Sequence, residues 1–193
     1  LVHFNTIRRH RFEESMLLDE SSVVNLELFD NQSGQRQHTL YAVVNRTLTP
    51  MGGRLLRQWL RQPLLDLDQV NQRLDAIDAF RGQFMLCGEF RALLKMIQDL
   101  PRIMGRISLP VAGIADLVAL RESIQPLRTI PEFLKEFDTP LINQIRDDFD
   151  TLEELKGLLN EQLLDEPSNR LREGGFMAAG VSEELDELRR ISQ

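Results

Sequence analysis

The stretch from Thr47 to Ile77 constrains the fold most, because its prolines and capping residues fix where helices begin and end. Thr49 can cap a helix through its hydroxyl, and Pro50 then takes the first helical position, where its missing N–H costs nothing. Pro63 cannot continue that helix. Asp66 follows as the N-cap of a second helix, so the stretch predicts two helices joined by a rigid corner.

Both predicted helices carry an apolar stripe. The members of the first stripe, which recur every four residues or lie beside one that does, are Met51, Leu55, Leu56, Trp59 and Leu60. Those of the second, spaced at i, i+4 and i+7 after the capping-box residue Gln69, are Val70, Leu74 and Ile77. We expect both stripes to face a core. Nothing in this corner has the pattern of a catalytic site.

The middle of the chain repeats short helical signals that prolines and capping residues separate. Apolar stripes over 90–97 and 100–107 predict two helices. Pro110 opens a longer helix, closed by Pro126, whose inward-facing residues are Ile114, Leu117, Val118 and Ile124. Pro131 and the Thr139-Pro140 pair each start another segment. Thr151 and Glu154 form a capping-box pattern before a leucine-rich helix.

Shorter signals precede the corner. Residues 1–18 alternate apolar positions around the basic run Arg8 to Arg11, and two short strands joined by a polar turn fit them best. The basic run is a place for phosphate contacts or, as such runs more often are, a solvated turn. Asp19 to Leu28 predicts a short helix or turn, and Asp30 to Gln37 predicts a loop. Thr39 then starts a short helix.

The chain changes character after Asp165. Residues 170–180 predict a hairpin that turns at Gly174-Gly175, where glycine permits positive φ. Ser182 then caps a last helix. The expected fold class is therefore mainly α, a multi-helix array with a small N-terminal β element and a short β-hairpin near the C-terminus. We assign residues 1–165 to one domain portion and 166–193 to the hairpin and the start of a further helix.

Composition narrows the class of protein. Hydrophobic residues make up 42% and charged residues 27% of the 193 residues, as in ordinary soluble globular proteins. No apolar run approaches the roughly 20 residues that span a bilayer, so we expect a cytoplasmic protein without membrane contact. The net charge of -7 argues against a surface that serves as a whole as a nucleic-acid groove. Because the chain begins at Leu1 and stops at Gln193 within a helical pattern, we expect a fragment of a longer protein.

Catalytic and metal-binding patterns are not found in the sequence. The histidines His3, His10 and His38 lack metal-ligand spacing, and the single cysteine, Cys87, forms no zinc pattern. Neither GxxxxGK[ST] nor GxGxxG occurs. We therefore expect no catalytic, cofactor-binding or metal-binding residues in this chain.

The order of the motifs carries a resemblance. The run MLLDESSVVNLEL, a glycine-containing loop, a Thr-Leu pair and NRTLTPMGGRLLRQWLRQPL occur in that order. This succession resembles the core, or lever, domain of the MutS family of DNA mismatch repair proteins. The signature positions that match the family pattern are Asp19, Asn25, Glu27, Thr47, Thr49, Gly52, Arg54, Trp59, Pro63 and Arg73.

Toward the C-terminus, GGFMAAGVSEELDELR is similar to the family's glycine-rich hairpin and the start of its long lever helix. Ser22 stands where the family has threonine, which keeps the hydroxyl. Glu173 and Ser182 replace the more usual Asp and Asn. Val181 stands where tyrosine is common, so any role of that tyrosine does not carry over.

The resemblance implies a structural lever that couples an ATPase to a DNA clamp in a protein that binds mismatched DNA. The mismatch-reading motif, the ATPase and the clamp are not in this sequence, so the resemblance implies no enzyme activity here. ATP and Mg belong to the parent protein, which is expected to be dimeric and to reach DNA through its other domains. Arg54 is expected to pair with a nearby carboxylate. The alternative, from composition and periodicity alone, is a helical protein-interaction module with no nucleic-acid role.

Overall fold

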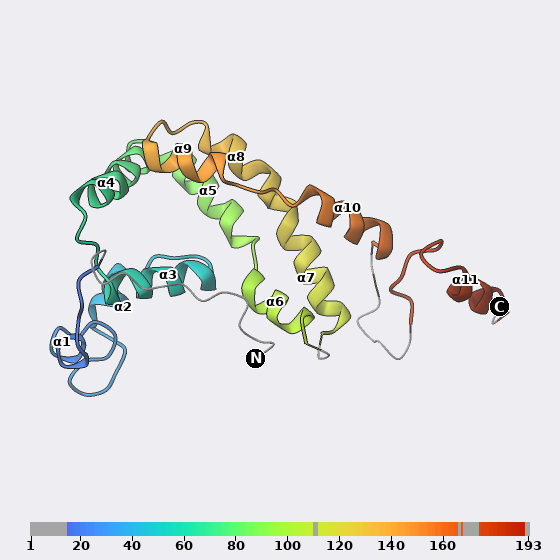
Figure 1. Cartoon of the computed structure of the whole chain (residues 1–193), viewed down its shortest axis with the longest axis horizontal. Coiled ribbons are helices and arrows are strands. Elements are labelled where there is room, and N and C mark those ends of the chain that lie inside the picture. The colour runs from blue at the N-terminus through green and yellow to red at the C-terminus, as the bar shows by residue number, and fades with distance from the viewer. Residues whose placement is uncertain (1–14, 110–111, 166, 168–173, 192–193) are drawn as a thin grey trace. The chain divides into compact units, whose positions relative to one another are not determined.

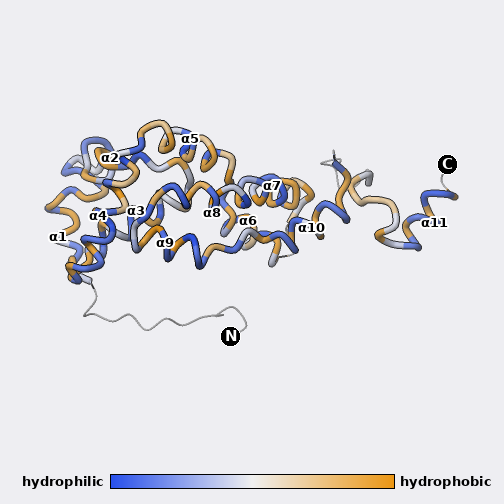
Figure 2. Tube along the Cα trace, turned by 90° about the horizontal axis from the view of Figure 1, so that it is seen from above, coloured by the Kyte–Doolittle hydropathy of each residue, from blue (hydrophilic) through white to orange (hydrophobic). Residues whose placement is uncertain are grey.

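The computed structural model describes residues 15–109, 112–165, 167 and 174–191. The chain divides into two compact units, Leu1–Ala79 and Phe80–Gln193, and the boundary falls inside helix α4. In both units apolar and polar residues alternate along the helices at short intervals, as Figure 2 shows. This alternation is typical of helices that bury one face.

Four helices account for the regular structure described in the first unit. They are α1 (Glu20–Asn25), α2 (Leu40–Val44), α3 (Pro50–Arg61) and α4 (Leu67–Gly82) (Figure 1). Their boundaries follow the predicted signals. Thr49 is the N-cap of α3 and its hydroxyl accepts the N–H of Gly52 at 3.1 Å. Helix α3 ends at Arg61, directly before the residue that precedes Pro63.

The start of α4 differs in one detail from the predicted capping box. The Asp66 carboxylate accepts the backbone N–H groups of Asp68 at 2.9 Å and Gln69 at 3.3 Å, as an N-cap should. The side chain of Gln69 donates to the other Asp66 carboxylate oxygen at 2.9 Å. In a reciprocal box the Gln69 side chain would instead accept the backbone N–H of Asp66.

The core of the first unit is small. Val23, Leu28 and Phe29 are buried, and Leu18, Tyr41 and Leu60 pack against them. Helix α3 therefore contributes the Leu60 edge of its stripe to this core.

The prediction that both corner stripes are buried is wrong. The side chain of Trp59 is 38% exposed and that of Leu74 is 53% exposed, and Leu55 and Ile77 are exposed as well. Helix α3 has no buried residue, and Ala76 is the buried residue of α4. The core is built on α1 and the segment that follows it, so it covers one edge of α3 and leaves the stripe centred on Leu55 and Trp59 open.

The second unit is helical over most of its described length. Its elements are α5 (Phe84–Lys95), α6 (Leu100–Ile107), α7 (Ile114–Ile124), the 3-10 helix η1 (Gln125–Arg128), α8 (Thr129–Leu134), α9 (Pro140–Asp147), α10 (Glu153–Gln162) and α11 (Glu183–Ile191). Helix α7 packs against α6 and α10, and α8 packs against α9 (Figure 1).

Aromatic rings and branched aliphatic side chains fill the core of this unit. The rings of Phe80 and Phe137 lie 4.3 Å apart, and those of Phe90 and Phe133 lie 5.0 Å apart, measured between centroids. Phe137 also contacts Phe133 at 6.0 Å, so the four rings form one cluster. The buried aliphatic residues around it are Ile97, Ile103, Ile114, Leu120, Ile124, Leu127, Ile130, Leu134 and Ile142.

Two predicted helix boundaries need correction. Helix α7 ends at Ile124 before Pro126, as predicted, but the chain stays helical through η1 and α8. The capping box of Thr151 and Glu154 is wrong: the N-cap of α10 is Leu152, in the left-handed region at φ 56°, with no side-chain cap bond. The N–H of Leu152 donates to the Asp150 carboxylate at 2.8 Å, which orders this turn from upstream.

The described residues contain no strand, so the small β elements predicted at both ends are not found there. Two isolated antiparallel bridges, Ser15 with Leu64 and Leu163 with Met177, are the β-type pairings among them. The predicted strands before residue 15 and the hairpin arm at 168–173 lie outside the described residues. Gly174 and Gly175 have positive φ, at 68° and 73°, as predicted for a turn. No helix in the described part of the chain is long and apolar enough to cross a membrane.

Replacing Phe137 with alanine should lower the free energy of unfolding by about 3–5 kcal/mol, because this ring is 1% exposed and touches two other rings. Urea denaturation followed by circular dichroism measures the change. Phe84→Ala is the matched control, since that ring is 88% exposed, and it should stay within about 0.5 kcal/mol of wild type. Equal effects of the two variants would contradict the core described above.

Candidate functional site

The signature residues of the first unit act mainly on helix ends and turns. Asp19 caps α1: its carboxylate accepts the backbone N–H of Ser22 at 2.7 Å. Hydrogen bonds from the side chain and the backbone of Ser22 lower the pKa of Asp19 below its ordinary value. Asn25 is the last residue of the same helix.

Glu27 joins α1, the following loop and α2. Its backbone lies in the left-handed region at φ 47°, which turns the chain directly after α1. Its carboxylate accepts the N–H of Gln32 at 2.9 Å, and its carbonyl accepts the N–H of Leu40 at 3.1 Å. The loop is closed by Asn31, whose side-chain oxygen accepts the N–H groups of Ser33 and Gln35, both at 2.9 Å. Glu27 is therefore a joint between two helices.

The start of α3 is packed closely around its two glycines. A Cβ on Gly52 would lie 3.2 Å from the Thr49 hydroxyl oxygen and 3.4 Å from Thr47 Cβ, and one on Gly53 would lie 3.2 Å from the Tyr41 hydroxyl. That hydroxyl donates to the Gly53 carbonyl at 3.3 Å. The structure thus brings Thr47, Thr49 and Gly52 together. An open depression lies here, lined by Tyr41, Asn45, Thr47, Thr49, Pro50, Gly53, Arg54 and Arg57.

The corner itself is held by stacking. The guanidinium of Arg73 lies 3.7 Å from the centroid of the Trp59 ring, so α4 covers part of this exposed indole. Partial burial lowers the pKa of Arg73. The carbonyl of Pro63 accepts the N–H of Met16 at 2.7 Å, which fixes the corner to the start of the described chain. The pairing of Arg54 with a carboxylate stays a prediction.

Sequence reasoning missed one contributor to this cluster. Arg57 lies with its guanidinium 4.5 Å from the Phe29 ring centroid and 5.1 Å from that of Tyr41, so it joins α3 to α2 and the small core. A basic residue on the flank of an apolar stripe carries no signal that distinguishes this from a solvated side chain. Glu27 was part of the resemblance, but its left-handed backbone has no sequence signal either.

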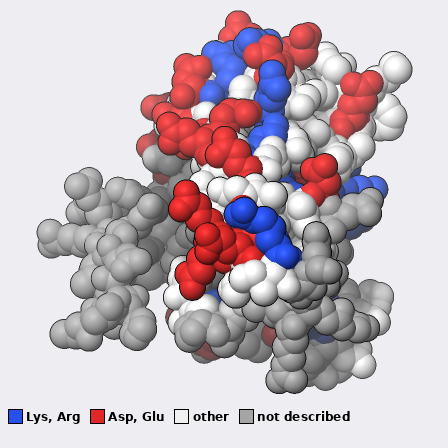
Figure 3. All heavy atoms as spheres, turned by 90° about the vertical axis from the view of Figure 1, so that its right-hand side faces the viewer, with Lys and Arg blue, Asp and Glu red and all other residues white. Residues whose placement is uncertain are grey.

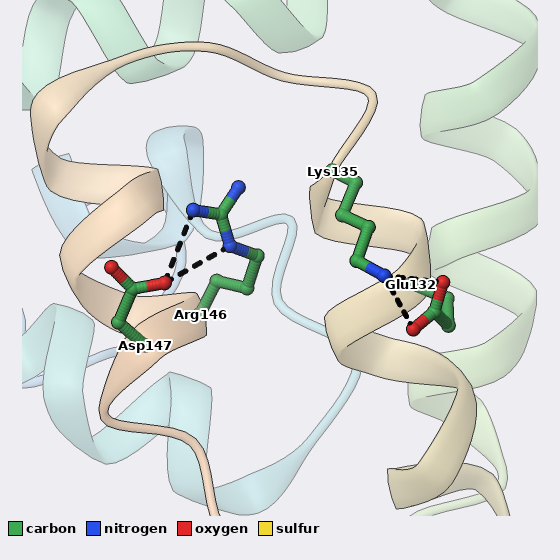
Figure 4. Close-up of polar contacts among 4 residues, drawn as sticks. All are labelled: Glu132, Lys135, Arg146 and Asp147. Carbon is green, nitrogen blue, oxygen red and sulfur yellow. Dashed lines mark hydrogen bonds and ion pairs between the residues drawn. The ribbon is translucent and has the colours of Figure 1, made fainter.

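Charged groups elsewhere pair locally. In Figure 4 Lys135 reaches Glu132 of its own helical turn and Arg146 reaches the neighbouring Asp147, with N···O distances of 2.7 Å and 3.1 Å. The buried carboxylate of Asp116 pairs with Arg106 and accepts the N–H of Gly113, which fixes the start of α7. On the face drawn in Figure 3 acidic groups form several clusters and the basic groups form no continuous stripe. Among the described residues no group of three or more His, Cys, Asp and Glu side chains could hold a metal ion.

Comparison with known proteins shows the family to which the chain belongs. A family model described as MutS domain III matches residues 21–192 of the chain. The chain belongs to the MutS family. The signature residues described above, apart from Asp19, lie within the matched residues.

Similar curated proteins match nearly the whole length of this chain. A DNA mismatch repair protein MutS from Halothermothrix orenii is 40% identical over 191 residues, 98% of this chain and 21% of the relative. Those from Syntrophobacter fumaroxidans and Methanosarcina mazei are 39% and 38% identical, over 99% and 100% of this chain. The chain spans 21% to 22% of the length of these relatives. The alternative of an interaction module unrelated to mismatch repair finds no support in them.

Acid should weaken α1 through Asp19. Because the pKa of Asp19 is lower in the folded chain, its contribution to stability is present above its ordinary value of 3.8 and is lost as the pH falls through the lower, folded value. In Asp19→Asn the side-chain oxygen still accepts a hydrogen bond but does not titrate. Urea denaturation at pH 7 and at pH 2 should show a smaller loss of stability on acidification for this variant than for wild type. An equal loss would contradict the assigned role of the carboxylate.

Trp59 and Arg73 should be energetically coupled. A double-mutant cycle with Trp59→Leu and Arg73→Met should give a coupling free energy of about 0.5–1 kcal/mol, as expected for a guanidinium over an exposed ring. Since Trp59 is the chain's single tryptophan, its fluorescence should also change in Arg73→Met. Arg61→Met is the control on the same helix, because Arg61 pairs with Glu20 and should leave the emission unchanged. Zero coupling would show that the stack does not hold the corner.

Proposed function

We propose that this MutS-family chain is the lever portion of a mismatch repair protein, in which it links the parts that bind mismatched DNA to the part that hydrolyses ATP. The observation that carries the proposal is the match of residues 21–192 to MutS domain III. The chain itself holds no catalytic residue in this proposal. ATP and Mg act elsewhere in the parent protein, which is dimeric and cytoplasmic.

The described contacts support such a role. Short-range contacts tie the helices of the first unit in pairs: Glu27 joins α1 to α2, and the stack of Arg73 on Trp59 joins α3 to α4, so these neighbouring elements move together. The four-ring cluster of the second unit has the same effect on α4, α5 and α8, since close-packed interiors shift between discrete arrangements instead of deforming smoothly. A scaffold with these properties can carry a displacement from one end to the other.

A chimera tests the proposal. In the Halothermothrix orenii relative, this chain should replace the matched 21% of the sequence and preserve mismatch-stimulated ATP hydrolysis. Pro63→Gly, which loosens the corner, should leave DNA binding and basal ATP hydrolysis intact. It should reduce the stimulation of ATP hydrolysis by mismatched DNA by about 2- to 30-fold. This is the range that changes of about 0.5–2 kcal/mol in the coupling free energy produce.

Pro101→Gly is the matched control, because Pro101 is an exposed residue in the first turn of α6. This variant should keep the stimulation. If Pro63→Gly keeps it as well, or if it abolishes DNA binding and ATP hydrolysis alike, the corner has no role in transmission.

The chain alone should bind duplex DNA weakly and without preference for a mismatch. The net charge of the chain is -7, whereas binding to the phosphate backbone of DNA requires clustered Lys and Arg side chains. A gel-shift titration with matched and mismatched duplexes of equal length measures both quantities. Tight, mismatch-selective binding at moderate salt would contradict a purely linking role.

A further inference from the structure

The segment that forms α2 and α3 is basic, although the chain as a whole is acidic. Residues 31–65 hold five arginines and neither Asp nor Glu, so all 30 acidic residues of the chain lie outside this segment. Helices α2 and α3 fall entirely within it. In a chain with a net charge of -7, a folded segment without carboxylates has a local field that attracts anions.

The open depression at the start of α3 belongs to this basic segment. All eight residues that line it come from residues 31–65, and Arg54 and Arg57 are the charged ones among them. The depression lies within the first unit of the chain. A concave surface whose lining holds two guanidinium groups and no carboxylate suits an anionic ligand.

Arg57 is positioned by rings rather than by hydrogen bonds. Its guanidinium lies 4.5 Å from the ring centroid of Phe29 and 5.1 Å from that of Tyr41. Neither ring supplies an acceptor oxygen, so these contacts fix the guanidinium without satisfying its N–H donors. The residue is exposed, so an acceptor on another protein can reach these donors.

Asn45 adds a second donor to the lining. Its side-chain oxygen accepts both the backbone N–H of Thr47 at 3.1 Å and the Thr47 hydroxyl at 2.7 Å. The two hydrogen bonds orient the amide and engage its acceptor, which leaves its NH₂ group as the part that can bind a ligand. Donors on Asn45 and Arg57 are what the oxygens of a carboxylate require.

A protein carboxylate fits this arrangement better than the DNA backbone. Duplex DNA is bound by several cations that follow successive phosphates, whereas the depression offers one position. Arg61 could extend a basic row along α3, but it pairs with Glu20 at 2.9 Å. A planar guanidinium held by stacking matches the two oxygens of one carboxylate in bidentate pairing.

We propose that the depression at the start of α3 binds an Asp or Glu side chain of an acidic protein segment, with Arg57 and Asn45 as its donors. The proposal concerns the first unit by itself and does not rest on the lever function. Its failure would therefore leave the proposed function unchanged.

Titration of the 193-residue chain with hexaglutamate, followed by NMR of the backbone amides, tests this site. The amides of Thr47, Gly52 and Gly53 should shift, and hexaglutamine at the same concentration should leave them in place. Arg57→Gln should weaken the binding about fivefold, because the charge-assisted pair of an exposed guanidinium is lost. Asn45→Asp keeps an oxygen for Thr47 and adds a negative charge to the depression, so it should weaken the binding at least as much. If Arg57→Gln fails to fold, as judged by circular dichroism, Asn45→Asp decides.

Arg36→Gln is the matched control, since it removes the same charge from the same basic segment but does not line the depression. It should change the affinity for hexaglutamate by less than about twofold. Equal losses in Arg36→Gln and Arg57→Gln would mean a diffuse charge effect and overturn the site. Unshifted amides in the presence of hexaglutamate, or tighter binding of a short DNA duplex at the same amides, would overturn it as well.

Discussion

The first unit depends on side chains that satisfy the free N–H groups at helix starts. Its helices bury little: the described core consists of Val23, Leu28 and Phe29, and α2 and α3 contain no buried residue. Asp19, Thr39, Thr49 and Asp66 each accept a backbone N–H at the start of the helix that follows. Isolated helices this short are marginal in water, so these caps and the stacked arginines take over part of the work of a core.

The second unit has a different basis. Ring contacts link Phe80, Phe90, Phe133 and Phe137. Because Phe80 and Phe137 are far apart in the sequence, their contact joins the end of α4 to the segment after α8. Ser123, fully buried, accepts the N–H of Gln98, so the polar group inside this core is satisfied. Two kinds of rigidity, one local and one from packing, thus occur in a single MutS-family chain.

Several helix starts were predictable from the sequence, although the one assigned to Thr151 was not, and the helix faces that meet were not predictable. Thr49-Pro50, Asp66 and Thr139-Pro140 specify local backbone bonds, and local rules are sufficient for those. The stripe of Leu55 and Trp59 shows only that a face is apolar; which neighbour covers it depends on contacts across the fold, and here the core meets the Leu60 edge instead.

Backbone conformation set a second limit on prediction. Glu27 and Leu152 adopt left-handed φ values, which are uncommon for residues with a Cβ, and the neighbouring bonds that hold them are not visible as a motif. The candidate site could be found as a set of signature positions. The cap at Thr49 was predicted, whereas the role of Glu27 as a joint and the stack of Arg73 on Trp59 became visible only in the structure.

The close packing around Gly52 restricts which residues can occur together at the start of α3. A glycine inside a helix ordinarily costs about 0.5–1 kcal/mol relative to alanine, so alanine would be the better residue by helix propensity alone. At this position a methyl group would press on the Thr49 hydroxyl that caps the same helix, 3.2 Å away, and on Thr47. A side chain at Gly52 therefore requires Thr49 or Thr47 to shift, and the shift of Thr49 would disturb the cap of the helix that gains the methyl group.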